Sequence, residues 1–192
     1  MNGVHLKKEV DLLSKPITNI RHDILITTRK LIAESGYENL NIRNIASRCG
    51  IATGTLYNYY KSKQEIVEEI VDNEWQVISR RIEQGAKDCV NLTDKMGIIY
   101  TELCVFMKDV HNVLIDNFLF LVNTDEFSKV KCHKKLYVDE LSEKIQSIIE
   151  DCNEDKNFKF LADVICKLFI AYSYQGNVSF KTLEPVILSI LK

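Results

Sequence analysis

The stretch from Thr53 to Lys63, TGTLYNYYKSK, gathers hydroxyl, aromatic and basic groups whose shared chemistry is contact with a nucleic acid. Short hydroxyl side chains, or bare backbone at Gly54, can approach base edges and phosphate oxygens. Lys61 and Lys63 flank the expected start of a helix, where free N–H groups and the helix dipole already favour a phosphate. These groups could bind DNA only if a short helix presents them together.

The preceding residues predict such a helix, as the second of two joined by a tight turn. Gly50 can adopt the left-handed conformation that ends the first helix, Ile51 fills the angle between the helices, and Ala46 is small enough for a close crossing. Leu56 and Tyr60 are expected to face the core, while Tyr59 could pack there or face outward. The first helix has an apolar face at helical spacing: Ile42, Ile45, Ala46 and Cys49. This is the helix-turn-helix pattern, whose second helix enters the DNA major groove.

Residues 53–65, TGTLYNYYKSKQE, resemble the signature of the TetR family of bacterial transcriptional regulators. The resemblance covers roughly Asn19 to Ile70, and beyond it only length and helical character agree. No strand-like alternation recurs along the chain, which predicts an all-α fold of about nine helices. Residues 1–63, ordered from about residue 18, would form the helix-turn-helix DNA-binding domain. Residues 64–192 would form a helical domain for effector binding and dimerisation.

The resemblance also implies which residues meet DNA. Tyr57 matches the family's phosphate-contacting tyrosine, and Arg43 matches a position that contacts bases or backbone. For Tyr57 and Tyr59 half-buried packing is the alternative, and for Arg48 a surface ion pair explains the residue equally well. The expected DNA-binding set is Arg43, Thr53, Gly54, Thr55, Tyr57, Tyr59, Lys61 and Lys63.

Composition and charge favour a globular protein of this kind. The chain has 192 residues, 46% hydrophobic and 27% charged, with only seven Gly and two Pro. Residues 1–63 carry ten Lys or Arg against five Asp or Glu, whereas residues 64–192 carry fifteen against twenty-two. The basic balance of residues 1–63 beside the acidic balance of residues 64–192 favours DNA binding by the N-terminal segment. Without a long apolar run or signal peptide, the chain is expected to be cytoplasmic and to have no membrane partner.

Helical periodicity continues to the end of the chain. Asn19 or Thr18 can cap a helix ending near Ser35, and Ser62 with Glu65 forms a capping box for a helix ending near Gly85, in which Trp75 is expected in the core. The last helix is expected to begin near Ser179 or Thr182, and Pro185 fits its first turn if Thr182 is the cap. Further helices are expected near residues 92–108, 113–122, 127–150 and 158–175.

The resemblance places a small-molecule pocket among the middle helices and dimerisation in the last two. The candidate effector-binding residues, each with plain core packing as its alternative, are Met96, Tyr100, Leu103, Cys104, Phe106, Met107, Phe118 and Phe120. The apolar stripes of the last two helices give the candidate dimer interface: Leu161, Ala162, Ile165, Cys166, Phe169, Tyr172, Leu183, Val186, Ile187 and Ile190.

The leading hypothesis is a repressor released from a pseudo-palindromic, double-stranded operator by an unidentified small molecule. One alternative is a nucleoid-associated or constitutive DNA-binding regulator on the same scaffold. An enzyme is the disfavoured alternative, because the sequence has no Gly-rich phosphate loop, no GxSxG and no metal-ligand spacing. The six cysteines show no paired spacing, so neither a disulfide framework nor a metal or cofactor is expected.

Overall fold

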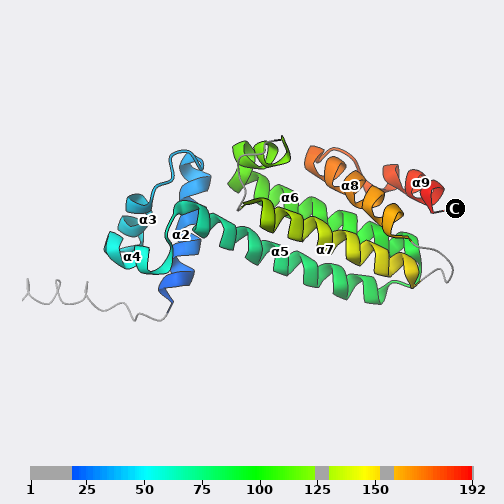
Figure 1. Ribbon diagram of the computed structural model, residues 1–192, viewed down its shortest axis with the longest axis horizontal. Coiled ribbons are helices and arrows are strands. Elements are labelled where there is room, and N and C mark those ends of the chain that lie inside the picture. Colours follow the sequence, from blue (N-terminus) through cyan, green and yellow to red (C-terminus); the bar gives the residue numbers. More distant parts are fainter. Residues whose placement is uncertain (1–18, 124–129, 152–157, 192) are drawn as a thin grey trace, which may run out of the picture. The chain divides into compact units, whose positions relative to one another are not determined.

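The structure is a computed structural model that describes residues 19–123, 130–151 and 158–191, with the side chains of residues 110–136 outside the description. Over this part of the chain it contains eight helices and no strand, so the predicted all-helical class is confirmed (Figure 1). The chain divides into two compact units, Met1–Ile70 and Val71–Lys192. The division falls inside one helix, whereas the sequence predicted a boundary at that helix's first residue.

The first unit consists of α2 (Ile20–Ser35), α3 (Ile42–Cys49), α4 (Thr53–Tyr59) and the opening turns of α5 (Lys63–Asp88). Asparagine side chains cap α2 and α3: Asn19 accepts from the His22 amide at 3.3 Å, and Asn41 from the Asn44 amide at 2.9 Å. Gly50 ends α3 with φ of 70°, a left-handed conformation that favours glycine, so the predicted turn is confirmed.

The core of this unit lies where α2, α3, α4 and α5 meet. Leu56 is fully buried and Tyr60 is 2% exposed, as predicted, and Ala46 is 1% exposed at the predicted crossing of α3 and α4. The alternative of core packing for Tyr59 is wrong, because its side chain is 40% exposed. The other buried residues are Ile24, Thr28, Leu31, Ile32, Leu40, Ile45, Ile66, Val67 and Ile70.

The second unit contains the rest of α5, α6 (Leu92–Asn123), α7 (Val130–Glu150), α8 (Lys159–Gln175) and α9 (Phe180–Ile190). The predicted break between residues 108 and 113 is wrong: α6 runs through it, and no Gly or Pro stands there to end a helix. The predicted end of α5 at Gly85 is also wrong. A Cβ at Gly85 would lie 3.0 Å from Ile98, so the glycine allows α6 to approach closely instead.

Of the two predicted starts of the last helix, near Ser179 or near Thr182, the earlier one is confirmed. Phe180 opens α9 with Ser179 as cap, and Pro185 lies inside the helix. The placement of Pro185 in a first turn capped by Thr182 is therefore wrong. The Thr182 amide instead donates to the Ser179 carbonyl at 3.0 Å, which closes the first turn.

A seam of polar side chains joins α5 to α7 within the second unit. The Trp75 indole N–H donates to Glu140 at 2.7 Å, and the Ser79 hydroxyl donates to the other oxygen of the same carboxylate at 2.8 Å. Tyr137 donates to Asp72 further along the seam. Lys144 extends it by pairing with Glu83, and it lies 3.5 Å from Glu140. The predicted core position of Trp75 is confirmed, with 1% of the residue exposed.

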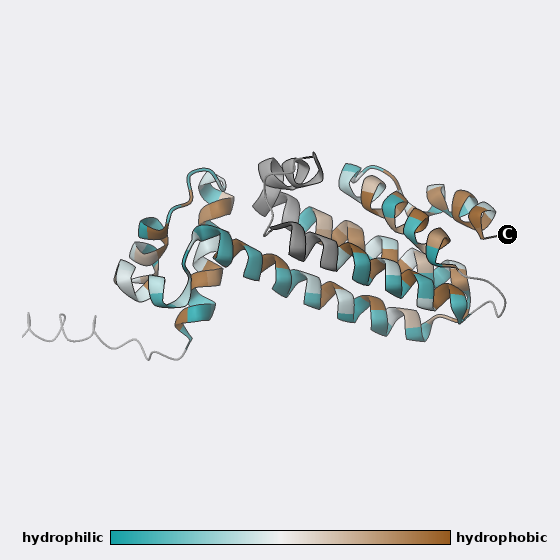
Figure 2. Cartoon of the chain, viewed as in Figure 1, coloured by the Kyte–Doolittle hydropathy of each residue, from teal (hydrophilic) through white to brown (hydrophobic). Residues whose placement is uncertain are grey.

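Two aromatic side chains of α6 that the structure describes, Tyr100 and Phe106, belong to separate clusters. Phe106 packs against Trp75 with ring centroids 5.4 Å apart, and Tyr137 contacts the same indole at 5.3 Å. Tyr100 instead packs against Phe169 of α8, at 5.2 Å. Its hydroxyl donates to the carbonyl of Val178 at 2.8 Å, which fixes the loop between α8 and α9. Hydrophobic residues are frequent along α8 and α9 (Figure 2).

Candidate nucleic-acid interface

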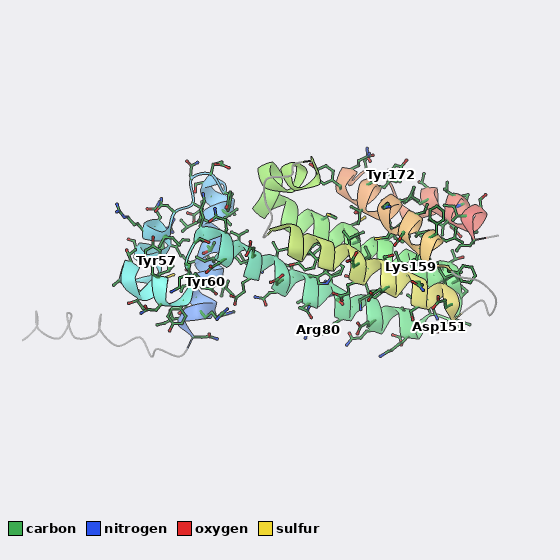
Figure 3. All side chains as sticks on the ribbon, in the orientation of Figure 1. Tyr57, Tyr60, Arg80, Asp151, Lys159 and Tyr172 are labelled. Atoms are coloured by element: carbon green, nitrogen blue, oxygen red, sulfur yellow. The ribbon has the colours of Figure 1, made fainter. Side chains whose placement is uncertain are left out.

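Helix α4 presents one apolar side to the core and the remainder of its surface to solvent. Leu56, in the helix, and Tyr60, directly after it, anchor it inside the unit. Tyr57 is 45% exposed, and Gly54 and Asn58 are exposed as well. Figure 3 labels Tyr57 and Tyr60, whose side chains come from this one short segment but differ in burial. The arrangement leaves an exposed helix that could enter a groove of DNA.

An open groove of about 660 Å³ adjoins this exposed helix. It brings together three predicted DNA-binding residues, Arg43 from the start of α3, Tyr57 from α4 and Lys63 from the start of α5. Leu40, Asn41, Ile42 and Asn44 complete the lining. The other predicted residues, Thr53, Gly54, Thr55, Tyr59 and Lys61, lie outside that lining. Contacts of the whole set with DNA stay predictions.

Lys63 is held by a partner that the sequence analysis missed. Its Nζ donates to the Tyr37 carbonyl at 3.0 Å and lies 4.3 Å from the centre of the Tyr37 ring, a cation–π contact. Burial, and then the charges of Glu38 and Glu68, raise the pKa of the Tyr37 phenol. An ammonium group has three donors, so Lys63 keeps donors for a phosphate while its position is fixed.

The junction of α4 and α5 uses its polar groups to close both helix ends. The Lys61 Nζ donates to the carbonyl of Tyr57 at 3.1 Å, near the C-terminal end of α4, where a cation is favourable. Ser62 accepts from the Glu65 amide at 3.2 Å, as the predicted capping box requires. Glu65 departs from that motif by accepting from the Lys61 amide, at 2.6 Å, rather than from Ser62.

A second cluster holds α2, the end of α4 and α5 together. Arg21 forms two hydrogen bonds with Glu69, at 2.7 and 2.6 Å, and its guanidinium lies 5.3 Å from the centre of the Tyr60 ring. These hydrogen bonds lower the pKa of Glu69 and raise that of Arg21, while burial is the largest cause of the raised pKa of Tyr60. Arg48 pairs with Glu34, so the surface ion pair left open for Arg48 is present.

Effector binding by the predicted residues of α6 stays a prediction, and the structure shows how those with described side chains pack. Five are buried: Met96, Tyr100, Leu103, Phe106 and Met107. Tyr100 and Phe106 belong to the two different aromatic clusters described above. Cys104 is half-buried, and burial raises the pKa of its thiol. The predictions for Phe118 and Phe120 lie outside the described side chains.

Some of the predicted dimer residues are buried within the single chain, and others are partly exposed. Six are already covered by the chain's own packing: Ala162, Ile165, Cys166, Phe169, Leu183 and Ile187. Leu161, Tyr172 and Ile190 are half-buried, and Val186 is 47% exposed. Burial raises the pKa of Cys166 to about 12, in keeping with an unreactive core thiol. A partner subunit could therefore contact only the second, more exposed group directly.

The first unit, with its tight turn and exposed short helix, defines a helix-turn-helix DNA-binding domain. Residues 24–70 match the family model described as bacterial regulatory proteins, tetR family. This match lies inside the segment on which the sequence resemblance was based. Among the helices that the structure describes, none is long and apolar enough to cross a membrane.

Two curated relatives carry the comparison further. The fatty acid metabolism regulator protein of Bacillus subtilis is 27% identical over 86 residues, 45% of this chain and 44% of that protein. The transcriptional repressor KstR2 of Mycolicibacterium smegmatis is 25% identical over 190 residues, 94% of this chain and 92% of that protein. The first match thus spans less than half of its relative, whereas the second spans nearly all of it.

Solved structures share the fold over most of the chain. A transcriptional regulator from Cytophaga hutchinsonii aligns with a TM-score of 0.67 at 15% identity, covering 90% of this chain and 95% of that one. FadR from Bacillus subtilis, in complex with stearoyl-CoA, aligns at 0.64 with 20% identity, covering 88% and 96%. The family-model match over residues 24–70 identifies the first unit with the DNA-binding unit of TetR-family bacterial transcriptional regulators, and the remainder of the chain shares the fold of the solved regulators.

The Arg21–Glu69 pair predicts a pH-dependent contribution to stability. Glu69→Gln removes the carboxylate, and because the pair is partly exposed we expect a loss of about 0.2–1 kcal/mol at pH 7. The folded-state pKa of Glu69 is depressed, so this contribution is present above the ordinary value of 4.5 and disappears as pH falls through the lower folded value. Urea unfolding followed by circular dichroism at pH 7 and below pH 4.5 measures it.

Glu143→Gln, an exposed carboxylate on α7, is the matched control and should change the free energy of unfolding little at any pH. A Glu69→Gln loss that stays constant as the solution is acidified would contradict the assigned ion pair.

Proposed function

We propose that this chain is a transcriptional repressor that binds a pseudo-palindromic operator as a homodimer and is released by a small apolar effector. The observation that carries the proposal is the exposed α4 beside the groove that joins Arg43, Tyr57 and Lys63. Base edges and phosphates can be contacted from this one surface, as a helix-turn-helix requires. The similarity to KstR2, a repressor by name, supports the direction of regulation.

Binding to DNA would depend strongly on phosphate contacts. Lys63 and Arg43 line the groove from the ends of two helices, and Lys61 is exposed beside the end of α4. Each lysine or arginine that neutralises a phosphate releases counterions, so affinity falls as salt rises. The basic balance of residues 1–63 adds a favourable field around these contacts.

Dimerisation would use the apolar residues of α8 and α9 that the chain itself leaves uncovered. On α8 the half-buried residues Leu161, Leu168 and Tyr172 recur at seven- and four-residue steps, so they lie on one face of the helix. On α9 the exposed Val186 and the half-buried Ile190 are four residues apart, so they also lie on one face of their helix. A second copy of this chain would cover both faces, in a seam of roughly 1,600 Å² or more in total.

The effector would act on the middle helices of the second unit. The similar proteins suggest an effector with a large apolar part, since two are named for fatty acid metabolism and ketosteroid regulation and one was solved with stearoyl-CoA, whose acyl chain is apolar. Helix α5 is continuous from Lys63, at the groove, through Trp75 and Ser79, which hydrogen-bond to α7. A ligand that moves α7 along this seam would move α5, and a coupling of about 1–3 kcal/mol is enough for regulation.

Lys63→Ala should weaken binding to operator and random duplexes by similar factors, and should reduce the salt slope by about one, because the lysine contacts a phosphate. Thr55→Ala should weaken binding to the operator duplex more than binding to duplexes of random sequence. Fluorescence anisotropy across a KCl series measures both, with Lys87→Ala, an exposed lysine of α5 in the second unit, as the control. Unchanged operator affinity in the Tyr57→Ala, Lys63→Ala double variant would show that the interface lies elsewhere.

Leu168→Glu should shift the protein from dimer to monomer, because it places a charge in the apolar seam. Light scattering at micromolar concentration reports the mass, and Gln76→Glu adds the same charge on exposed α5 as a control. The monomeric variant should also lose high-affinity operator binding while its helical content stays unchanged. A monomeric unmodified protein under these conditions would rule out the proposed dimer.

Stearoyl-CoA, as a probe of the effector class, should weaken operator binding about 5- to 150-fold, and operator DNA should weaken the probe by the same factor. Trp75 is the chain's one tryptophan, so its fluorescence should change if the α5–α7 seam moves. Coenzyme A without the acyl chain is the control. A probe that binds while operator affinity stays constant would favour the ligand-independent regulator instead.

A further inference from the structure

The outermost residues of α4 are Gly54 and Asn58. Each residue turns an α-helix by about 100°, so with Leu56 pointing into the core the second residue on either side lies farthest from it. Both positions are exposed, whereas Leu56 is fully buried. They lie one turn apart on the same face of the helix. This face of α4 would therefore come closest to a binding partner.

No neighbour that the structure describes requires a glycine at position 54. A Cβ there would meet no atom within 4 Å, and its backbone is not among those with positive φ. Alanine is the better helix former by about 1 kcal/mol in a helix interior, so glycine brings no advantage to the folded chain. Its use lies in leaving the backbone of this face bare for close approach from outside.

Asn58 brings a paired donor and acceptor to the same line. Its side chain is exposed, and it makes no hydrogen bond with any residue that the structure describes. The other exposed side chains of α4, Tyr57 and Tyr59, each offer a single hydroxyl. Tyr57 also belongs to the groove with Arg43 and Lys63, where phosphate contacts are expected. The amide of Asn58 is thus the group on α4 suited to bidentate recognition.

We propose that Asn58 reads an adenine in each half of the operator, through the major groove. The amide Oδ1 would accept from the adenine N6 amino group while Nδ2 donates to N7, a pairing that asparagine makes with adenine alone among the bases. Gly54, one turn away, lets α4 lie deep enough for the short asparagine side chain to reach the base edge. The inference rests on the proposed function and names the residue that sets its sequence preference.

Selection from a pool of random duplexes, followed by sequencing, tests the assignment. The unmodified protein should select a pseudo-palindrome that contains one symmetry-related pair of strongly preferred A·T positions. Asn58→Ala should lose the preference at that pair and keep it elsewhere in the motif. Asn73→Ala makes the same change at an exposed helical position of α5 in the second unit, and it should select the unaltered motif.

Base analogues then identify the atoms involved. Replacing the selected adenine by 7-deazaadenine, which lacks N7, or by purine, which lacks the N6 amino group, should weaken the unmodified protein. The expected loss with both changes combined is roughly 5- to 150-fold per half-site, the discrimination of one bidentate pair. Asn58→Ala should bind the analogue and adenine duplexes equally. Its salt slope should match that of the unmodified protein, because no phosphate contact is lost.

The Gly54→Ala variant tests independently whether the bare backbone at position 54 serves DNA binding rather than folding. Its thermal unfolding midpoint should equal or exceed that of the unmodified protein, while its operator affinity falls more than its affinity for random duplexes.

The outcomes separate the inference from the function on which it rests. If the unmodified protein selects a motif and Asn58→Ala selects the same motif with the same preferences, the inference is wrong and the repressor proposal stands. If the unmodified protein shows neither a motif nor salt-dependent duplex binding, the proposed function itself is wrong.

Discussion

Burial of Leu56 and Tyr60 is the interaction on which the candidate interface depends. Helix α4 has seven residues, and an isolated helix that short is not stable in water, so tertiary packing must hold it. These two side chains, 0% and 2% exposed, anchor the helix at its middle and just past its end. Arg21, above the Tyr60 ring and paired with Glu69, then fixes the second anchor to α2 and α5. The outward side of α4 is free for recognition because its inward side is fully used.

Helix α5 serves two cores by different means. Its opening turns bury Ile66 and Ile70 in the first unit, where apolar contact supplies stability without a strict register. In the second unit Trp75 and Ser79 share the Glu140 carboxylate, and hydrogen bonds of this kind are directional. Sliding α7 by one turn would leave Glu140 without these donors, so the polar seam favours a few discrete registers. A helix whose position is fixed in a few discrete registers can change position when a ligand binds and transmit that change to the DNA-binding unit.

Local signals carried most of what the sequence could predict. The Asn19 cap, the left-handed Gly50 and the Leu56 anchor each follow from neighbours within a few residues, and all three are present. The Arg21–Glu69 and Lys63–Tyr37 contacts join residues 48 and 26 positions apart, and no periodicity reveals which of many exposed charges will meet. The apolar residues of α6 were recognisable as buried, yet their pattern could not show that Tyr100 and Phe106 serve different clusters.

Helix α8 shows why periodicity alone assigned too many residues to one surface. Apolar residues surround this helix, and only the folded chain shows that Ala162, Ile165 and Phe169 face its own core. The uncovered residues, such as Leu168 and Tyr172, are fewer but still continuous along one face. A twofold seam formed there would present two copies of α4 to one duplex. Each base contact would then be made once in each half-site, so its contribution to the free energy of operator binding would count twice. A recognition helix with few base-reading side chains could achieve sequence preference in this way.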